Sequence, residues 1–212
     1  MFNKFATTCL LISTVLSPYA YADTVSWASW VGQDGSFVQD GKPIDVSYSG
    51  QYAWTDFTSG IFDDVPGSFT NAVYTNTPGS NGTIALTGTG EGRFTFSHAV
   101  TNPLLALWSV GQPGYQVRFV FDTSNFEIVS EGAGHWGGGS LVQDGNRVTG
   151  EEGNGLIQFY GSYTSIHFQL PDYEYYYGAT IGAPTSAVPP PGSIWLMGST
   201  LLGLLSLKRH NA

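Results

Sequence analysis

The feature that most constrains this chain is a period-two alternation of apolar and polar residues, in short runs separated by turn residues. The segment GRFTFS places Phe94 and Phe96 on one face. The segment QVRFVFD does the same with Val117, Phe119 and Phe121. Alternation of this kind, enriched in β-branched and aromatic residues, is typical of strands with one buried face. We therefore expect a domain built from strands.

Further strand candidates and turns follow along the chain. The candidates are VSWASWV, PIDVSYSG, GTIALTG, LLALWSV, NGLIQFYG, SYTSIHFQ and YEYYYGATIG. In SYTSIHFQ the alternation places Thr164 on the same face as Ile166 and Phe168. Turn dipeptides occur at Asp34-Gly35, Asp40-Gly41, Asn81-Gly82 and Asp144-Gly145. The segment SLVQDGNRVTG predicts a hairpin with Asp-Gly-Asn at its tip.

Many short strands without helices between them predict an all-β fold. The expected arrangement is an antiparallel β-sandwich or jelly roll, with a closed barrel as the alternative. Residues 23–183 form this ectodomain, because a segment of that length can bury one proper core.

Residues 1–22 have the pattern of a secretory signal peptide. A lysine near the start precedes the apolar run FATTCLLISTVL, and Ala20 and Ala22 are the small residues before a cleavage site at Asp23. The alternative is an uncleaved membrane helix, but the apolar run is shorter than the about 20 residues that a span needs. Cys9 is the only cysteine, so we expect no disulfide, thiol nucleophile or cysteine metal site in the processed domain.

The ectodomain is strongly acidic. All 16 acidic residues of the chain fall within it, against four basic residues, which gives it a formal charge of −12. The basic residues are Lys42, Arg93, Arg118 and Arg147. A phosphate backbone would be repelled by this charge, so we expect no nucleic acid as a partner.

The C-terminal segment combines a proline-rich stretch, an apolar run and basic residues. Residues 184–191, PTSAVPPP, predict an extended and semi-rigid linker. Residues 192–212 begin with sixteen residues that carry no formal charge, followed by Lys208 and Arg209. As a helix these sixteen residues span about 24 Å, against about 30 Å for a bilayer core. We expect one transmembrane helix, with the two basic residues as a cytoplasmic membrane stop and the domain outside.

The order of these parts resembles the PEP-CTERM sorting tail of bacterial exosortase substrates. The residues that carry the resemblance are Val188, Pro189, Pro190 and Pro191, followed by TLLGLLSLKRH. Pro190 stands where the family usually has Glu. The resemblance implies recognition by an exosortase, a membrane-embedded cysteine protease, then cleavage near the proline motif and transfer to the cell surface. A permanent membrane anchor is the alternative.

The ectodomain also resembles a β-rich domain that such proteins often carry. The resemblance rests on the segments NPLLALWSVGQPGYQVRFVFD, GGGS, GNRVTGEEGNGLIQFYGSYTSIHF and YEYYYGATIG. It implies no activity. Proteins with this tail are commonly associated with exopolysaccharide, biofilm and flocs, which implies a role at the cell surface or in the extracellular matrix.

Residue patterns of known enzymes do not occur in the ectodomain. There is no Gly-x-Ser-x-Gly elbow and no HExxH motif. The histidines, at 98, 135 and 167, are scattered. If the segment with Glu151-Glu152 is extended, the two side chains point to opposite faces and cannot flank one glycosidic bond. We expect the pair in a solvated turn and not as a catalytic pair. We predict a protein without enzymatic activity; a polysaccharide hydrolase is one alternative.

A carbohydrate-binding module is the other alternative. Trp136 lies in the glycine-rich segment EGAGHWGGGS with few apolar neighbours, and we expect it to be exposed and to contact carbohydrate. The tyrosines of PDYEYYYG, at 173, 175, 176 and 177, should populate both faces of a strand. The remaining tryptophans of the ectodomain, Trp27, Trp30, Trp54 and Trp108, are expected to be core or strand-packing residues.

Calcium is the one cofactor that the sequence leaves open. Oxygen-rich loops on all-β domains bind this ion, and Asp63-Asp64 and Glu151-Glu152 are the candidate pairs. No EF-hand spacing accompanies either pair, so no metal ligand is assigned.

Overall fold

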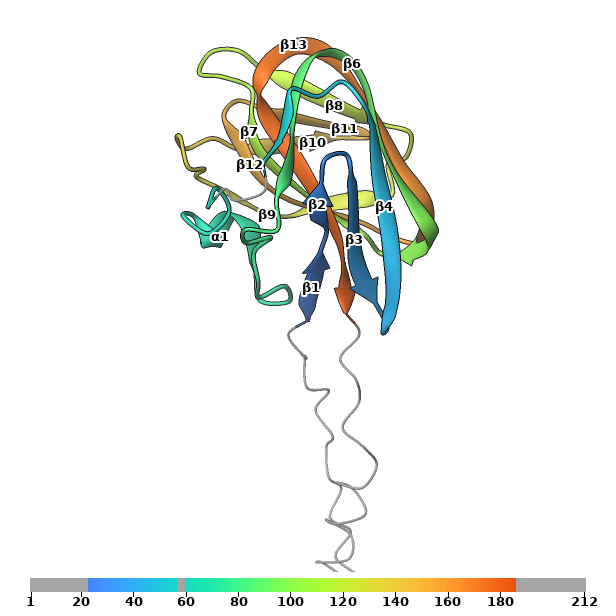
Figure 1. Ribbon diagram of the computed structural model, residues 1–212. Helices are drawn as coiled ribbons and strands as arrows, with labels where there is room; N and C mark the ends of the chain where they lie inside the picture. Colours follow the sequence, from blue (N-terminus) through green and yellow to red (C-terminus); the bar gives the residue numbers. More distant parts are fainter. Residues whose placement is uncertain (1–22, 57–59, 186–212) are drawn as a thin grey trace, which may run out of the picture.

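The computed structural model describes residues 23–56 and 60–185 (Figure 1). Its elements are β1 (Thr24–Trp27), β2 (Ser29–Val31), β3 (Asp34–Gln39), β4 (Lys42–Gly50), β5 (Trp54–Asp56), α1 (Pro66–Phe69), β6 (Thr83–Thr101), β7 (Leu104–Val110), β8 (Val117–Phe121), β9 (Phe126–Gly132), β10 (Leu141–Asp144), β11 (Arg147–Gly150), β12 (Gly153–Phe159) and β13 (Ser162–Thr185). In the part of the chain that the structure describes, the single helix is one turn long.

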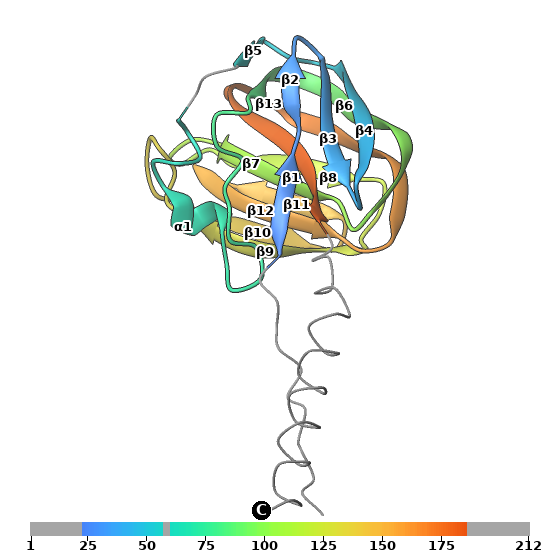
Figure 2. The ribbon, with the colours of Figure 1, turned by 60° about the horizontal axis from the view of Figure 1, so that its bottom comes forward.

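The strands pair antiparallel throughout the sheet, which confirms the expected all-β, sandwich-like fold. One layer has the order β10-β11-β8-β13-β6-β4-β3-β2. In the other, β9, β12 and β7 follow one another and join the second half of β13, beside β1. In Figure 2, β1 lies at the front, and β7 and β12 run across the view behind it.

Strands β6 and β13 belong to both layers. The sequence predicts two strands within each of them, and this is wrong, because each runs as one strand of 19 and 24 residues. The β6–β13 pair bends between the pairing of Leu170 with Gly90 and the pairing of Tyr177 with Leu86. More residues of β13 than of β6 lie in this stretch, which contains two register shifts. The extra residues on β13 are bulges, which bend a strand without ending its pairing. Gly88, at φ 71°, allows the bend on β6.

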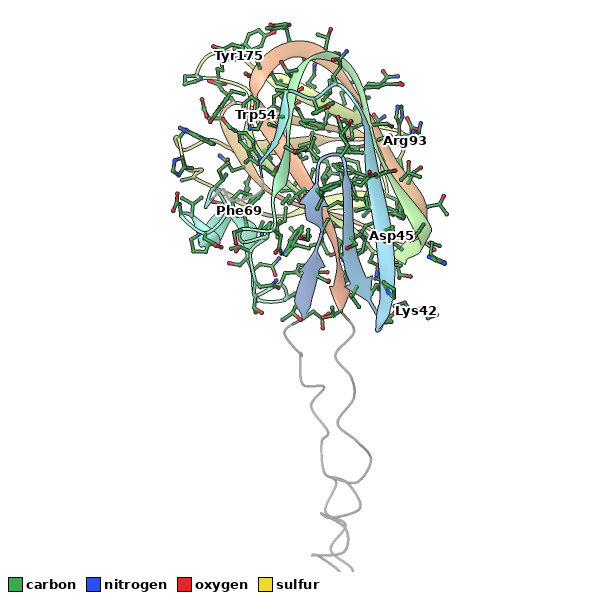
Figure 3. All side chains as sticks on the ribbon, viewed as in Figure 1. Lys42, Asp45, Trp54, Phe69, Arg93 and Tyr175 are labelled. Carbon is green, nitrogen blue, oxygen red and sulfur yellow. The ribbon has the colours of Figure 1, made fainter. Side chains whose placement is uncertain are left out.

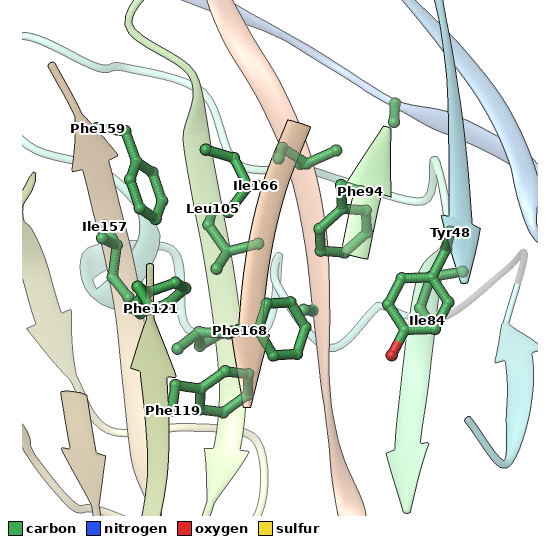
Figure 4. Close-up of a cluster of buried hydrophobic side chains, with 14 of the residues drawn as sticks. Tyr48, Ile84, Phe94, Leu105, Phe119, Phe121, Ile157, Phe159, Ile166 and Phe168 are labelled. Atoms are coloured by element: carbon green, nitrogen blue, oxygen red, sulfur yellow. The ribbon is translucent and has the colours of Figure 1, made fainter. Parts of the chain in front are cut away.

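The core lies between the layers (Figure 4). Its centre is a phenylalanine cluster of rings in mutual contact, and these rings are 0–2% exposed. The members are Phe94, Phe119, Phe121, Phe126, Phe159 and Phe168. The inward faces expected for GRFTFS and QVRFVFD are thereby confirmed, since Phe96 and Val117 are buried too.

Some local expectations are confirmed and others are wrong. The β10–β11 hairpin forms as expected, with Asp144 opposite Arg147. The turn at Asp40-Gly41 joins β3 to β4. Asp34 is the first residue of β3 and not a turn residue, because the turn is formed by the two residues before it, Gly32 and Gln33. Thr164 is exposed, because the pairing of β13 with β6 shifts beside it.

The first and last strands of the described chain lie side by side, because Thr24 of β1 pairs with Thr185 of β13. Strand β13 thus runs two residues past the ectodomain boundary expected at 183. The predicted signal peptide, the sorting motif at 188–191 and the predicted transmembrane helix lie outside the described residues. Within the described ranges, no helix has the length and apolar character needed to cross a membrane.

Candidate functional site

Exposed aromatic side chains gather where β6 and β13 bend. They are Tyr52, Trp54, Tyr115, Trp136, Tyr173, Tyr175 and Tyr176, and we call this surface the aromatic end. Figure 3 shows Trp54 and Tyr175 at this end of the molecule and Lys42 at the opposite end. The other exposed large apolar side chains of the described chain are four valines on other segments. The aromatic end is therefore distinct in composition from the rest of the surface.

Three of these rings form a continuous row, which we call the aromatic strip. The ring centroid of Tyr176 lies 5.6 Å from that of Trp54 and 5.0 Å from that of Trp136. The three residues are 40%, 40% and 44% exposed for Tyr176, Trp54 and Trp136. Each ring therefore packs against its neighbour and still presents part of its surface to solvent.

The aromatic strip rests on a fourth ring that is buried. The indole of Trp108 lies 5.3 Å from Trp136 and 5.6 Å from Tyr176, and Trp108 is 1% exposed. Its Nε1 donates a hydrogen bond of 2.9 Å to Thr83. A Cβ on Gly178 would approach this indole to 2.6 Å, so the glycine leaves the space that Trp108 fills. The base of the strip is fixed by packing and by one buried hydrogen bond.

Trp54 was expected to be a core or strand-packing residue, and it is the second of these, since its ring packs on Tyr176 and stays 40% exposed. It lies on β5, where it pairs with Ala85 of β6, and Ala85 pairs in turn with Gly178 of β13. The two small residues let the Trp54 ring reach Tyr176 across the strands. Trp27, Trp30 and Trp108 are buried, as expected.

The expected exposure of Trp136 is confirmed, and glycines hold its loop close to the β11–β12 turn. A Cβ on Gly134 would lie 2.3 Å from the Asn154 side chain, and a Cβ on Gly139 would lie 2.0 Å from a backbone oxygen of Glu151. Glycine permits this close backbone approach. The Trp136 loop is thus packed onto the fold and does not project freely.

Polar groups flank Trp136 on its loop. The His135 ring lies edge-on to the Trp136 ring at 4.6 Å. Nδ1 of His135 is hydrogen-bonded to the Asp64 carboxylate, which ties the loop to the segment before α1. An imidazole and a carboxylate therefore stand beside the exposed indole.

A second polar group lies beside the buried Trp108. Ser109 and Glu152 both have positive φ, 51° and 57°, a conformation that is uncommon for residues other than glycine. The amide of Asn154 holds them, accepting from the Ser109 N–H at 2.8 Å and donating to the Glu152 carbonyl at 2.7 Å. The Ser109 hydroxyl donates to the Glu152 carboxylate at 3.3 Å. Strained residues that are held in place by buried hydrogen bonds are a feature of functional sites.

Glu174 is buried beneath the aromatic end and is 1% exposed. Its Oε1 accepts hydrogen bonds from Gln112 Nε2 at 3.0 Å and from the backbone N–H groups of Tyr175 and Tyr176 at 2.9 and 3.2 Å. Gln112 exchanges two backbone hydrogen bonds with Tyr115. One carboxylate therefore positions exposed rings on β13 and in the β7–β8 turn.

Two buried oxygens near this position lack a hydrogen-bond partner among the described residues, Oε2 of Glu174 and the hydroxyl of Tyr177. Burial, followed by the nearby charges of Tyr48 and Glu174, raises the pKa of Tyr177. Tyr177 is the one tyrosine of PDYEYYYG that faces fully inward, so the expectation that this segment populates both faces is confirmed.

An ion pair neutralises the basic residue of the aromatic end. Arg118 donates to both carboxylate oxygens of Asp172, with two hydrogen bonds of 2.7 Å. These hydrogen bonds hold the pKa of Asp172 below its ordinary value. Asp172 directly precedes Tyr173, so the pair lies among exposed tyrosines.

The three histidines do not come together, since each has different partners. His98 contacts Ser97, while His167 lies between Asp122 and Glu91, at 2.8 and 3.2 Å. His135 pairs with Asp64 at the aromatic end.

The paired carboxylates also separate. Glu151 accepts from the Gly114 N–H at 2.7 Å, whereas Glu152 accepts from Ser109. Asp63 accepts from the Thr77 hydroxyl. Within residues 23–56 and 60–185, no group of three or more His, Cys, Asp or Glu side chains could hold a metal ion.

Comparison of the chain with models of protein families, with curated proteins and with solved structures gave no match. The site is therefore interpreted from its own geometry. Exposed aromatic faces beside hydrogen-bonding side chains suit a ligand that has both apolar faces and hydroxyl groups.

Proposed function

We propose that this is an exported, non-enzymatic surface or extracellular-matrix protein whose β domain binds polysaccharide through the aromatic strip. The observation that carries the proposal is the row Trp54–Tyr176–Trp136, exposed on one side and supported by Trp108 on the other. A sugar ring has a C–H face that packs on an aromatic ring and a rim of hydroxyls that needs hydrogen-bonding partners. His135, Asp64 and Glu152 lie around the strip to provide such partners.

The composition of the aromatic end favours carbohydrate over an apolar protein surface. All seven of its exposed rings are Trp or Tyr, which carry a polar group on the ring. The exposed large aliphatic side chains of the described chain are four valines, and none of them belongs to a segment that carries one of these rings. Protein interfaces are enriched in Phe and Met as well as in Tyr and Trp, and the exposed large apolar side chains of the described residues include neither Phe nor Met.

A titration of the purified chain with extracellular polysaccharide from its own host tests the proposal. Trp136→Ala and Trp54→Ala should each weaken binding about tenfold, as loss of an aromatic anchor does. Val38→Ala is the matched control, because Val38 is 43% exposed and pairs with Pro43, beside Lys42 at the opposite end of the molecule (Figure 3), and the affinity of this variant should equal that of the parent. Parallel titrations with calcium and with a chelator test whether the ion takes part. Equal affinities for all variants would reject the aromatic strip as the site.

The absence of catalysis is part of the proposal and has its own test. Support comes from the separate hydrogen-bond partners of the histidines and of Glu151 and Glu152. Incubation of the same polysaccharide with the protein should release no new reducing ends. Release that stops in Glu152→Gln would instead favour a polysaccharide hydrolase.

The sorting role rests on the tail sequence, and the arrangement of the domain is consistent with it. Thr24 and Thr185 pair at the end of the molecule opposite the aromatic end (Figure 1). A membrane helix after the linker would therefore leave the aromatic strip facing away from the membrane. The mass of the mature C-terminus, measured with and without the host's exosortase, tests processing near Val188–Pro191. An unprocessed end through Lys208 and Arg209 in both strains would contradict sorting and favour a permanent anchor.

A further inference from the structure

We infer that the ligand of the aromatic strip is an uncharged polysaccharide bound along its length and not by a chain end. The inference rests on the proposed function and adds the class of polymer and its mode of binding. It follows from the openness of the strip, from the charges around it and from the exposed rings beyond it.

The aromatic strip is an open surface. Its three rings are each at least 40% exposed, although each also packs on a neighbouring ring. A ring that lined a deep pocket would be covered by walls on more than one side. A cavity of about 490 Å³ does exist, but it is lined by Lys42, His98 and their neighbours, at the end opposite the strip. An open row can accept a chain that continues past it in both directions, whereas a chain end is recognised by a closed pocket.

The charges at the aromatic end disfavour an acidic polymer. Asp64, Glu151 and Glu152 lie around the Trp136 loop, and among the described residues the arginine of this end, Arg118, is engaged by Asp172 while His135 is bonded to Asp64. An acidic polysaccharide would meet negative charge there without a free basic side chain to bind it.

The same contacts disfavour a cationic polymer. The carboxylates of Asp64, Glu151 and Asp172 already accept hydrogen bonds from protein donors. Asp172 is charge-paired with Arg118, and Asp64 is bonded to the His135 ring, so each has a partner that competes with an ammonium group, whereas a sugar hydroxyl needs only one open acceptor position. The aromatic faces and the remaining acceptor positions suit hydroxyl-rich, uncharged sugars best.

The exposed rings continue beyond the strip. Tyr173 and Tyr175 are 62% and 59% exposed, and Tyr175 is the chain neighbour of Tyr176. The buried Glu174 carboxylate accepts from the N–H groups of both Tyr175 and Tyr176, so it fixes the position of the outer ring relative to the strip. The Tyr175 ring is not one of the rings in contact within the strip, so a polymer has to extend past the strip to cover it.

The test uses the host's extracellular polysaccharide, divided by anion exchange into an uncharged fraction and an acidic fraction. Part of the uncharged fraction is cut by mild acid and sorted by length. The uncharged fraction should bind with an affinity that does not change with salt. Fragments of two or three sugars should bind at least about tenfold more weakly than long chains, because they contact fewer rings. Tyr175→Ala should weaken binding of long chains and leave that of short fragments unchanged, whereas Trp136→Ala should weaken both.

Binding of the acidic fraction alone, weakening as salt is added, would overturn the inference and leave the proposed function standing. Short fragments that bind as tightly as long chains would do the same, because they would indicate recognition of a chain end. If neither fraction binds and Trp136→Ala instead abolishes self-association, then both the inference and the proposed function are wrong.

Discussion

The phenylalanine cluster and the aromatic strip are both rows of aromatic rings in contact, but they differ in residue type and burial. Phe119 and Phe168 have centroids 5.0 Å apart in the core, the same separation as Trp136 and Tyr176 on the surface. The core rings are fully buried, while the strip rings are at least 40% exposed. The core rings also carry no polar atom, whereas each strip ring carries one.

Because of this difference, ring contacts in the core stabilise the fold, whereas ring contacts on the surface leave apolar area for a ligand. Burial of a Phe side chain contributes about 1.5–3 kcal/mol to folding relative to leaving it exposed. The strip rings, which stay 40–44% exposed, gain only part of this free energy on folding and retain apolar area that a ligand can cover. We therefore expect the core rings to determine stability and the strip rings to determine binding, and the predictions below test that division.

Phe168→Ala should produce the largest loss of stability. Phe168 is 0% exposed and contacts three other rings of the cluster, Phe94, Phe119 and Phe121. Removing a buried Phe ring costs about 3–5 kcal/mol, because a cavity remains. Urea unfolding followed by tryptophan fluorescence measures the loss. Val142→Ala, exposed on β10, should change stability by no more than about 0.5 kcal/mol. Similar losses for both variants would contradict the buried position of Phe168.

Glu174→Ala should have the next largest effect and should act on both regions. It removes the acceptor of three hydrogen bonds beneath the aromatic end. Donors left without an acceptor cost about 1–3 kcal/mol. Because two of these donors are the backbone groups of Tyr175 and Tyr176, polysaccharide binding should weaken as well.

Glu174→Gln provides the control for this prediction, because it keeps an acceptor oxygen of the same reach. It should retain most of the stability and most of the binding. A Gln variant as impaired as the Ala variant would mean that the negative charge, and not the hydrogen bonds, is what Glu174 contributes.

Trp54→Ala should reduce polysaccharide binding strongly and the stability of the fold only weakly. It removes a ring that is 40% exposed and its contact with Tyr176, so the loss of stability should stay below the about 3–5 kcal/mol expected for a fully buried ring. The affinity for polysaccharide should fall about tenfold. Urea unfolding and a binding titration on the same preparation measure both quantities. A large loss of stability with unchanged affinity would make Trp54 a structural residue and break the division between the two regions.

The sequence predicts the core well because alternation records burial directly. Phe94, Phe96 and Phe119 follow the period of a strand, and each is buried as expected. The bend is missed for a physical reason. Gly88 and Gly90 are local turn signals, but here they curve β6 while its pairing with β13 continues. Only the partner strand distinguishes a bend from a break, and local sequence does not contain it.

The aromatic strip could be predicted only in part. Trp136 is recognisable from its glycine-rich surroundings, which contain few apolar neighbours to bury it. Trp54 carries no such local signal, and its exposure results from pairing with Ala85 on β6. Trp54, Trp136 and Tyr176 lie far apart in the chain, so their contact depends on strand pairings that local sequence patterns do not specify.

The smallest expected effect concerns the ion pair at the aromatic end and depends on pH. The hydrogen bonds from Arg118 lower the pKa of Asp172, so the charged carboxylate is favoured in the folded state. This contribution is present above the unfolded pKa of about 4 and is lost as the pH falls through the lower pKa of the folded state. The difference in urea midpoint between the parent and Asp172→Asn should therefore be small at pH 7, since Arg118 is partly exposed, and should shrink at acidic pH. The loss caused by Phe168→Ala should persist at both pH values, because no titratable group is removed with that ring. An Asp172→Asn difference that stays constant across the range would show that the carboxylate contributes by packing and not by its charge.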